Sequence, residues 1–422
     1  MAIPTEAPVQ PDPVPPRTEP TIGIPKTSNV EQPREQMTVL ELTERLKKIL
    51  PRKDVTQLFK TYKNVVKGKH FVQALAKEFS LTDEQAIAFG QDLQNAHILD
   101  HVSGDYDFDS NDKLYRLQCD HMPHVLNTYR VWTDRVDPNS LALMKRLKKM
   151  LARIEGAVTN PKTAQVDYKA AMTHKDMPEF EEAVCELQGV DYENMGYERK
   201  LAFSINVYNL MIKYAFMKLG IPTSTSARGS FFNDVSFQIG PDVFSFSEFE
   251  HGVLRGNRRA PYTLTAQFGS KDPRRRLIMT KVDPRIHFAL NCGANGCPPV
   301  KDFTEEALEE ELRIVAMAFC EGDEQVLVNE SSHSVSLSSI FKWYQEDFAE
   351  SSSGLPKAIL PFLRGVKQEK LKRMLHKLGG GPKVKFLTYD WSTNASDHLI
   401  YGSDAGFLQQ LGFGSTPTVP TQ

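Results

Sequence analysis

Six residues with chemically useful side chains gather in two short stretches of the C-terminal half of this 422-residue sequence. They supply a thiol, two imidazoles, a carboxylate, an amide and a guanidinium, which could act as nucleophile, base and orienting groups. The six are Cys292, His287, His251, Glu250, Asn291 and Arg255. Together they predict a cysteine-dependent hydrolase or acyl transferase, in which an imidazole holds the thiolate of Cys292 and Glu250 or Asn291 orients that imidazole.

The local geometry of IHFALNCG bears directly on this hypothesis. The alternating pattern after the turn at 283–285 predicts a strand, whose successive side chains point to opposite faces. His287 and Cys292 then face apart unless the chain breaks by Asn291, and Gly293 favours such a break. Backbone amides of residues 293–296 are candidate oxyanion donors. The alternative is that Cys292 is a small core residue and His287 a satisfied buried histidine.

Metal and cofactor chemistry have no comparable signature. Cys292 and Cys297 are separated by four residues, and no second pair of cysteines or histidines lies at the spacing of a zinc site. The glycine-rich stretch GGGPK at 379–383 is not followed by the Lys-Ser/Thr of a phosphate loop. We therefore expect no metal and no cofactor.

The segments around these residues indicate a mixed α/β domain. LAFSINVYNLMIKYAFMKLGI reads as a long buried helix, because its apolar residues cover more than one face. VSFQIG and VFSF alternate like the strands of a hairpin joined at 240–242. Ser247 and Glu250 have the spacing of a capping box, which opens a short helix that ends at Gly256.

Four blocks of this region resemble a known family, the domain of unknown function 547. They are AFSINVYNLM, FSFSEFEHGVLRGN, DPRIHFALNCGANGCPPV and VKFLTYDWSTN. The resemblance covers about 180–395 and implies a domain there but no particular chemistry, since the family's activity is unknown. The helix followed by a histidine-bearing segment is also similar to the core of papain-like and transglutaminase-like enzymes. That core has a cysteine at the start of the helix, where this chain has Asn206.

The composition of the whole chain limits the partners and the compartment that we expect. Lys plus Arg total 51 against 53 for Asp plus Glu, so no global field would drive the protein onto nucleic acid or an anionic membrane. Five scattered cysteines are typical of a reducing, intracellular compartment. No run approaches about 18 consecutive apolar residues, and the start lacks the features of a signal peptide. We expect a cytoplasmic protein that can be peripheral at membranes.

The N-terminal part changes character near residue 37. Residues 1–36 hold nine of the 26 prolines and few large apolar residues, which predicts a disordered leader. Periodic apolar residues then predict three helices, the third opened by a capping box of Thr82 and Gln85. HILDHV and DKLYRL read as a closing hairpin. A small winged-helix-like module follows from this order.

The stretch VKGKHFVQALAKEFSLTDEQAIAFGQDLQNAHILDHVSGDYDFDSNDKLYRL resembles the DEP domain of signalling proteins. The resemblance implies recruitment to an anionic membrane lipid or to a receptor tail. Between residues 41 and 69 there are nine basic residues against three acidic ones. The predicted binding residues among them, called the basic cluster below, are Lys47, Lys48, Arg52, Lys53, Lys60, Lys63, Lys67 and Lys69. Nucleic acid is not an expected partner, because the third helix is acidic.

These observations predict an α+β protein with a DEP-type winged-helix module and a larger mixed α/β domain, for which the resemblance implies a papain-like or transglutaminase-like core. The expected divisions are a leader at 1–36, the DEP-like module at 37–120, a helical connector at 121–179, the domain at 180–400 and a polar tail at 401–422. The predicted role is intracellular signal transduction. Nothing in the sequence fixes the oligomeric state.

Overall fold

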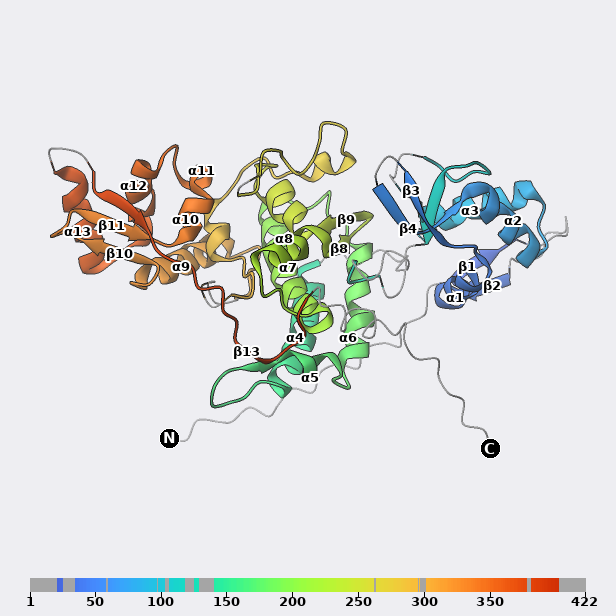
Figure 1. Cartoon of the computed structure of the whole chain (residues 1–422), viewed down its shortest axis with the longest axis horizontal. Coiled ribbons are helices and arrows are strands. Elements are labelled where there is room, and N and C mark those ends of the chain that lie inside the picture. Colours follow the sequence, from blue (N-terminus) through green and yellow to red (C-terminus); the bar gives the residue numbers. More distant parts are fainter. Residues whose placement is uncertain are drawn as a thin grey trace. The chain divides into compact units, whose positions relative to one another are not determined.

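The computed structural model describes residues 21–25, 35–57, 60–96, 98–102, 106–117, 125–128, 140–261, 263–294, 296, 301–377 and 381–401. The chain divides into two compact units, residues 1–118 and residues 119–422. Each unit has its own helices and sheets (Figure 1). The mixed composition of helix and strand confirms the predicted α+β class.

The first unit is the predicted winged-helix-like module. Its helices are α1 (Val39–Ile49), α2 (Gly68–Phe79) and α3 (Asp83–Asn95). Its main sheet has the order β3-β4-β6-β5, with β3 at Lys53–Gln57, β4 at Lys60–Lys67, β6 at Leu114–Leu117 and β5 at Leu99–His101. The three helices and the antiparallel β5–β6 pair confirm the prediction. The β3–β4 hairpin was not predicted, because a glycine turn and a clear alternation are both missing there.

The capping box that opens α3 is present as predicted. The Thr82 amide donates to Gln85 Oε1 at 3.0 Å, and the Gln85 amide donates to Thr82 Oγ1 at 3.2 Å. Helix α3 then buries Phe89 and Leu93 against the rest of the unit. Local sequence signals were sufficient here because both bonds join residues only three apart.

Part of the expected leader is a strand. β1 (Thr21–Ile24) pairs antiparallel with β2 (Glu35–Thr38), and Ile24 is buried. The alternating apolar residues of TIGI supply a pairing surface that the proline count of the whole segment conceals. The remaining residues of the leader, 1–20 and 26–34, lie outside the described residues, as does the expected tail beyond residue 401.

The second unit contains the rest of the described secondary structure. Its helices are α4 (Ser140–Ala157), α5 (Tyr168–Met172), α6 (Met177–Val184), α7 (Tyr197–Leu219), α8 (Thr225–Asp234), α9 (Leu308–Glu321), α10 (Ser339–Trp343), α11 (Gln345–Phe348), α12 (Leu355–Ile359) and α13 (Gly365–His376). Its strands are β7 (Val166–Asp167), β8 (Ser236–Ile239), β9 (Asp242–Ser245), β10 (Val326–Asn329), β11 (Ser334–Leu337), β12 (Lys383–Phe386) and β13 (Ala395–Asp397). They form the small sheets β8-β9, β10-β11-β12 and β13-β7.

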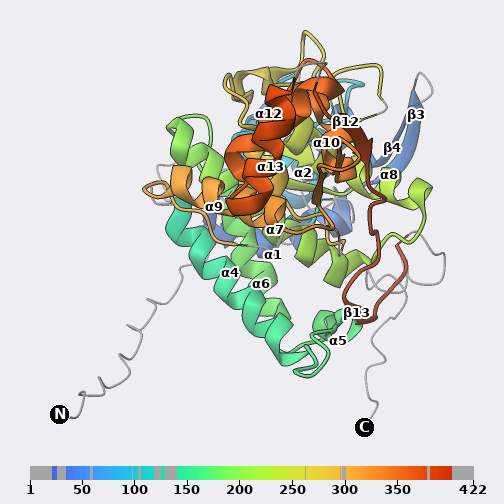
Figure 2. The same ribbon diagram turned by 90° about the vertical axis from the view of Figure 1, so that its left-hand side faces the viewer.

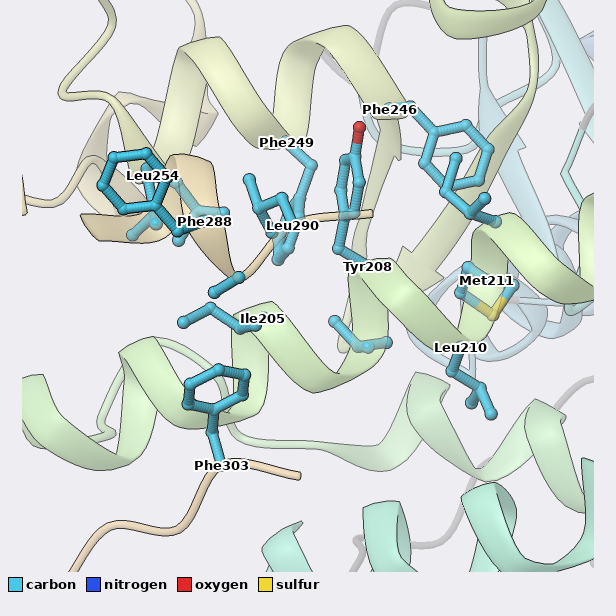
Figure 3. Packing of buried hydrophobic residues seen from close by; sticks show 14 of the residues in the cluster. Ile205, Tyr208, Leu210, Met211, Phe246, Phe249, Leu254, Phe288, Leu290 and Phe303 are labelled. Carbon is cyan, nitrogen blue, oxygen red and sulfur yellow. The ribbon is translucent and has the colours of Figure 1, made fainter. Parts of the chain in front are cut away.

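Helix α7 forms the centre of the core of this unit. Seventeen of its residues are buried, so it has no solvent-exposed face along most of its length. Figure 3 shows Ile205 and Tyr208 of this helix beside Phe249, Phe288 and Leu290. The predicted β8–β9 hairpin is also confirmed, with Ile239 opposite Asp242.

Helix α4, expected within a connector, packs into the same core. Its apolar residues Leu143, Leu147, Leu151 and Ile154 are buried, while Lys145 and Lys149 are exposed. It packs along α7 and lies beside α6 (Figure 2). The residues that the structure describes between 121 and 179 therefore belong to the second unit. Among the described helices, none combines the length and apolar character that crossing a bilayer requires.

Truncation of Leu147, which is completely buried, tests this packing. We expect Leu147→Ala to lower the free energy of unfolding of the second unit by about 2–5 kcal/mol, since it leaves a cavity. All three tryptophans lie beyond residue 118, so tryptophan fluorescence during urea unfolding of the full chain follows this unit alone. The exposed neighbour substitution Lys149→Ala is the control, and equal effects of the two substitutions would contradict the packing.

Candidate active site

A π-helix, η3 (Glu248–Leu254), carries two of the predicted site residues, Glu250 and His251. Bonds from the Arg255 amide to the Glu250 carbonyl and from the Asn257 amide to the Gly252 carbonyl have the wide spacing of this helix type. The predicted capping box at Ser247 is wrong. The reciprocal bonds join Ser245 and Glu248 instead, because the helical turn already begins at Phe246, so Ser245 is the residue that caps it.

Glu250 is a buried carboxylate with a partner on each oxygen. Tyr208 of α7 donates to Oε2 at 3.0 Å, and Tyr344, directly after α10, donates to Oε1 at 2.7 Å. Burial opposes ionisation, but the nearby His251 and His287, the bond from Tyr344 and the charge of Arg255 together lower the pKa of Glu250. Glu250 is therefore an anion at neutral pH that holds two phenols in place.

Arg255 fixes the state of His251. The Arg255 Nη1 group lies 3.2 Å from His251 Nδ1, and because a guanidinium can only donate, Nδ1 accepts and is unprotonated. Burial lowers the pKa of His251 to about 4, and the positive charge of Arg255 acts in the same direction. His251 is thus a neutral imidazole with its proton on Nε2.

The carboxylate of Asp347, on α11, joins these residues to His287. Its side chain is fully buried and accepts from Arg255 Nε at 2.6 Å, from Arg258 Nη1 at 2.6 Å and from His287 Nε2 at 2.7 Å. Burial alone would raise the pKa of Asp347, but these donors and their charges hold it well below its usual value. An ionised carboxylate can only accept, so the proton of His287 lies on Nε2.

His287 is therefore oriented as a neutral imidazole with Nδ1 unprotonated. Burial lowers its pKa in spite of the bond to Asp347. Its ring stacks on that of Tyr344, with centroids 3.8 Å apart and an interplanar angle of 18°. An Asp–His pair of this kind is the arrangement that orients a general base in many acyl-transfer enzymes.

The predicted strand through His287 is wrong. The segment is a 3-10 turn, η5 (Pro284–Phe288), capped by Asp283, whose carboxylate accepts from the Arg285 amide at 2.9 Å. Asp-Pro is a helix-start signal, since proline fits the first helical position and aspartate caps it. The strand-parity argument against a pairing of His287 with Cys292 therefore does not apply, and the papain-like helix-then-strand order stays a prediction.

A side chain of α7 holds the turn that ends in Cys292. Asn209 donates to the Ala289 carbonyl at 2.8 Å and accepts from the Asn291 amide at 2.8 Å. The Asn291 side chain in turn accepts from the Gly293 amide at 2.7 Å, so its oxygen holds the turn, and its predicted contact with an imidazole stays a prediction. Gly293 has φ +83, so the chain turns directly after Cys292, although there is no strand here for it to break.

Two of the four suggested oxyanion donors have other partners. The Gly293 amide is taken by Asn291, and the Gly296 amide donates to the Asp390 carbonyl at 3.0 Å. One of these amides bonds within the turn and the other to the segment after β12. Neither is therefore available to donate to a ligand. Asn295 lies outside the described residues.

Four of the six predicted residues line one pocket of about 330 Å³ in the second unit. These are Glu250, His251, His287 and Cys292. Cys292 is partly exposed, and its Sγ lies 3.7 Å from the Tyr389 hydroxyl. Burial chiefly, then the charge of Glu250, raises the pKa of Tyr208, which lines the same pocket as Cys292. Arg255 and Asn291 lie behind the lining and support it.

Sequence reasoning missed Tyr208, Tyr344, Asp347 and Tyr389. Tyr208 looked like one more core residue of an apolar helix. Tyr389 lies in a quoted block, VKFLTYDWSTN, but an isolated tyrosine carries no local signal of its partner. Tyr344 and Asp347 lie in the unremarked stretch FKWYQEDF, where four aromatic residues close to two adjacent acids were the one available hint.

In the first unit, some residues of the basic cluster pair with an acidic residue and others are exposed. Lys67 and Lys69 both pair with Asp112, at 2.9 and 3.0 Å, and Arg52 donates to the Lys47 carbonyl. Lys48 and Lys53 are exposed on α1 and β3. Lys60 and Lys63 lie on β4, and their side chains are outside the described part of the structure.

No group of three or more potential ligands that could hold a metal occurs within the described ranges, and Cys297 lies outside them.

Comparison with known families assigns both units. Residues 50–117 match the model of the domain found in Dishevelled, Egl-10 and Pleckstrin (DEP), and residues 192–320 match that of the protein of unknown function DUF547. The chain thus carries a DEP domain followed by a DUF547 domain, as the sequence motifs indicated. The second match ends before Tyr344, Asp347 and Tyr389, which complete the site. A search of curated proteins gives no match.

The low pKa of His251 predicts a pH-dependent stability. Between pH 6.5 and about 4 the unfolded chain protonates this histidine and the folded chain does not, so stability falls as the pH falls through this window. The contribution is on the order of 3 kcal/mol. His251→Asn keeps a hydrogen-bond acceptor for Arg255 but has no imidazole to protonate. We expect its free energy of unfolding, measured by urea unfolding followed by tryptophan fluorescence, to fall less steeply with falling pH than that of wild type. His376→Asn, at an exposed site, is the control. Parallel pH profiles for wild type and His251→Asn would contradict the assignment.

Proposed function

We propose that the second unit is a cysteine-dependent acyl-transfer enzyme, a hydrolase or transferase, with Cys292 as nucleophile and His287 as base. The observation that supports it best is the buried bond of 2.7 Å between Asp347 and His287, in a pocket that Cys292 also lines. Fixing the His287 proton on Nε2 leaves Nδ1 as the nitrogen that can accept the thiol proton.

The proposed reaction has two steps. Nδ1 of His287 takes the proton of Cys292, and the thiolate attacks the acyl carbonyl to form a thioester as the leaving group departs with that proton. Water or another acceptor then attacks the thioester, gives its proton to His287 and releases the thiol. Asp347 stays ionised throughout and stabilises the imidazolium form of His287. The Tyr208 and Tyr344 hydroxyls donate to Glu250, so their role is to shape the pocket.

Alkylation by iodoacetamide tests this proposal. We expect Cys292 in the full chain to react more than tenfold faster than glutathione at pH 6.5, because an unperturbed thiol with a pKa of about 8.5 is mostly protonated there. Glutathione is the reference because Cys185 and Cys320 are buried. Peptide mapping assigns the labelled residue.

Two substitutions separate the contributions to that rate. His287→Ala removes the base and should lower the Cys292 rate to that of glutathione, and Asp347→Asn should lower it in part. His376→Ala, at an exposed histidine, should leave it unchanged. A wild-type rate equal to that of glutathione, or one that His287→Ala does not alter, would contradict the assignment of nucleophile and base.

A second function belongs to the first unit. DEP domains commonly mediate membrane or receptor interactions, and we propose that the basic cluster recruits this chain to an anionic membrane surface or to an acidic receptor tail. The exposed side chains of Lys48 and Lys53 support this proposal. Each lysine or arginine close to an anionic bilayer contributes about 1 kcal/mol, so a few of them give reversible binding.

Sedimentation with vesicles of phosphatidylcholine and phosphatidylserine tests the recruitment. We expect the full chain to bind vesicles that contain phosphatidylserine, with affinity that falls as salt is raised. Lys48→Gln with Lys53→Gln should weaken binding at least tenfold. Lys77→Gln with Lys175→Gln, both exposed and outside the basic cluster, should not. An equal loss of vesicle binding in both double variants would contradict the cluster's role. Salt-sensitive binding to an acidic peptide, without binding to vesicles, would indicate a receptor tail as the partner.

A further inference from the structure

The pocket beside Cys292 has an aromatic wall. Trp343, Tyr389 and Trp391 pack on one another at tilted angles, and all three line the pocket. The ring centroids lie 5.0 Å apart for Trp343 and Tyr389, 5.5 Å for Trp343 and Trp391, and 4.7 Å for Tyr389 and Trp391. Trp391 is 37 % exposed, an unusual degree for so large an apolar surface. An apolar chain or ring that occupied the pocket would cover this surface. A volume of about 330 Å³ is at the lower end of small-molecule sites, which favours a small ligand.

The aromatic wall also carries an arginine, Arg228, whose polar contacts differ from those of the buried Arg255. Arg228, on α8, lies over the ring of Trp391, with its central carbon 4.6 Å from the centroid. Its Nη1 group makes one long bond, of 3.5 Å, to the Pro222 carbonyl. No carboxylate of the described residues pairs with it. By contrast, Arg255 is saturated by Asp347, Glu346 and the Arg259 carbonyl.

Arg228 is also close to the proposed nucleophile. Together with Cys292, Phe232 and Trp391 it lines a small hollow that adjoins the main pocket. A guanidinium stacked on an indole keeps its N–H edges available for two parallel bonds to a carboxylate. The residue is therefore placed to anchor one end of a ligand whose other atoms reach Cys292.

The carboxylates in and behind the pocket already have hydrogen-bond partners. Both oxygens of Glu250 accept from tyrosine hydroxyls, and His251 lies 3.6 Å from one of them. Asp347 is sealed behind the lining by two arginines and His287. An amine would thus meet in Glu250 a carboxylate already engaged by two hydroxyls, while an anion would meet Arg228, with which no described carboxylate pairs.

We infer that the pocket binds small anionic acyl compounds, whose apolar part packs on Trp343, Tyr389 and Trp391 and whose carboxylate pairs with Arg228. That such a compound is the substrate, with its reacting carbonyl at Cys292, rests on the proposed function. The binding itself does not require the thiol. Arg228 is in this account the residue that selects for a carboxylate.

Tryptophan fluorescence of the full chain with Cys292→Ala tests the inference, since two of the three tryptophans lie in the pocket. The probes are 4-phenylbutyrate, 4-phenylbutyramide and 4-phenylbutylamine, which share one apolar part and differ in charge. We expect saturable quenching, with the carboxylate bound about tenfold more tightly than the amide and the amine bound most weakly, because one charge-assisted pair contributes about that factor.

Substitution of Arg228 completes the test. Arg228→Gln should abolish the preference for the carboxylate but keep binding of the amide, and Arg228→Lys should restore part of the preference. Arg373→Gln, an exposed arginine paired with Glu330, should have no effect. A preference for the amine, no saturable quenching by any probe, or an unchanged preference in a folded Arg228→Gln chain would overturn the inference. Because Cys292 is absent from this assay, failure here leaves the labelling of Cys292 as an independent test of the enzyme.

Discussion

The site depends on one buried ion pair, between Arg255 and Asp347. It joins the π-helix that carries Glu250 and His251 to a short helix some 90 residues later, with bonds of 2.6 and 3.1 Å. Leaving either charge buried without its partner costs about 3–5 kcal/mol. Arg255 sets the tautomer of His251 and Asp347 sets that of His287. The same pair therefore fixes the protonation of both imidazoles and the position of three chain segments.

Local sequence signals predicted the elements whose bonds are local. The helices of the DEP domain, the capping box of Thr82 and Gln85 and the β8–β9 hairpin each follow from residues a few positions apart. The strand through His287 failed because alternation over six residues cannot distinguish a strand from a 3-10 turn when Asp-Pro precedes it. The β1–β2 pair failed because proline content was averaged over a segment that includes TIGI.

Half of the site was predictable and half was not, for a physical reason. Residue chemistry pointed to Cys292, His287, His251 and Glu250, and the fold brings these four to one pocket. Their partners Tyr344 and Asp347 lie far along the chain. Only the tertiary fold brings this tyrosine to Glu250 and this aspartate to His287, and no local pattern in FKWYQEDF marks them as site residues. Asn291 was predicted, as an alternative to Glu250, to orient an imidazole, and side-chain chemistry alone could not reveal that its oxygen binds the Gly293 amide.

The most direct test of the central claim is whether an acyl group becomes attached to Cys292 during turnover. The full chain, mixed with p-nitrophenyl acetate and quenched at early times, should release a burst of p-nitrophenol equal to the protein present. Peptide mass mapping should then find the acetyl group on Cys292 in wild type, and on a smaller fraction of Cys292 in Asp347→Asn at the same time point. Acetylation spread over lysines with Cys292 unmodified, and no burst, would contradict the account.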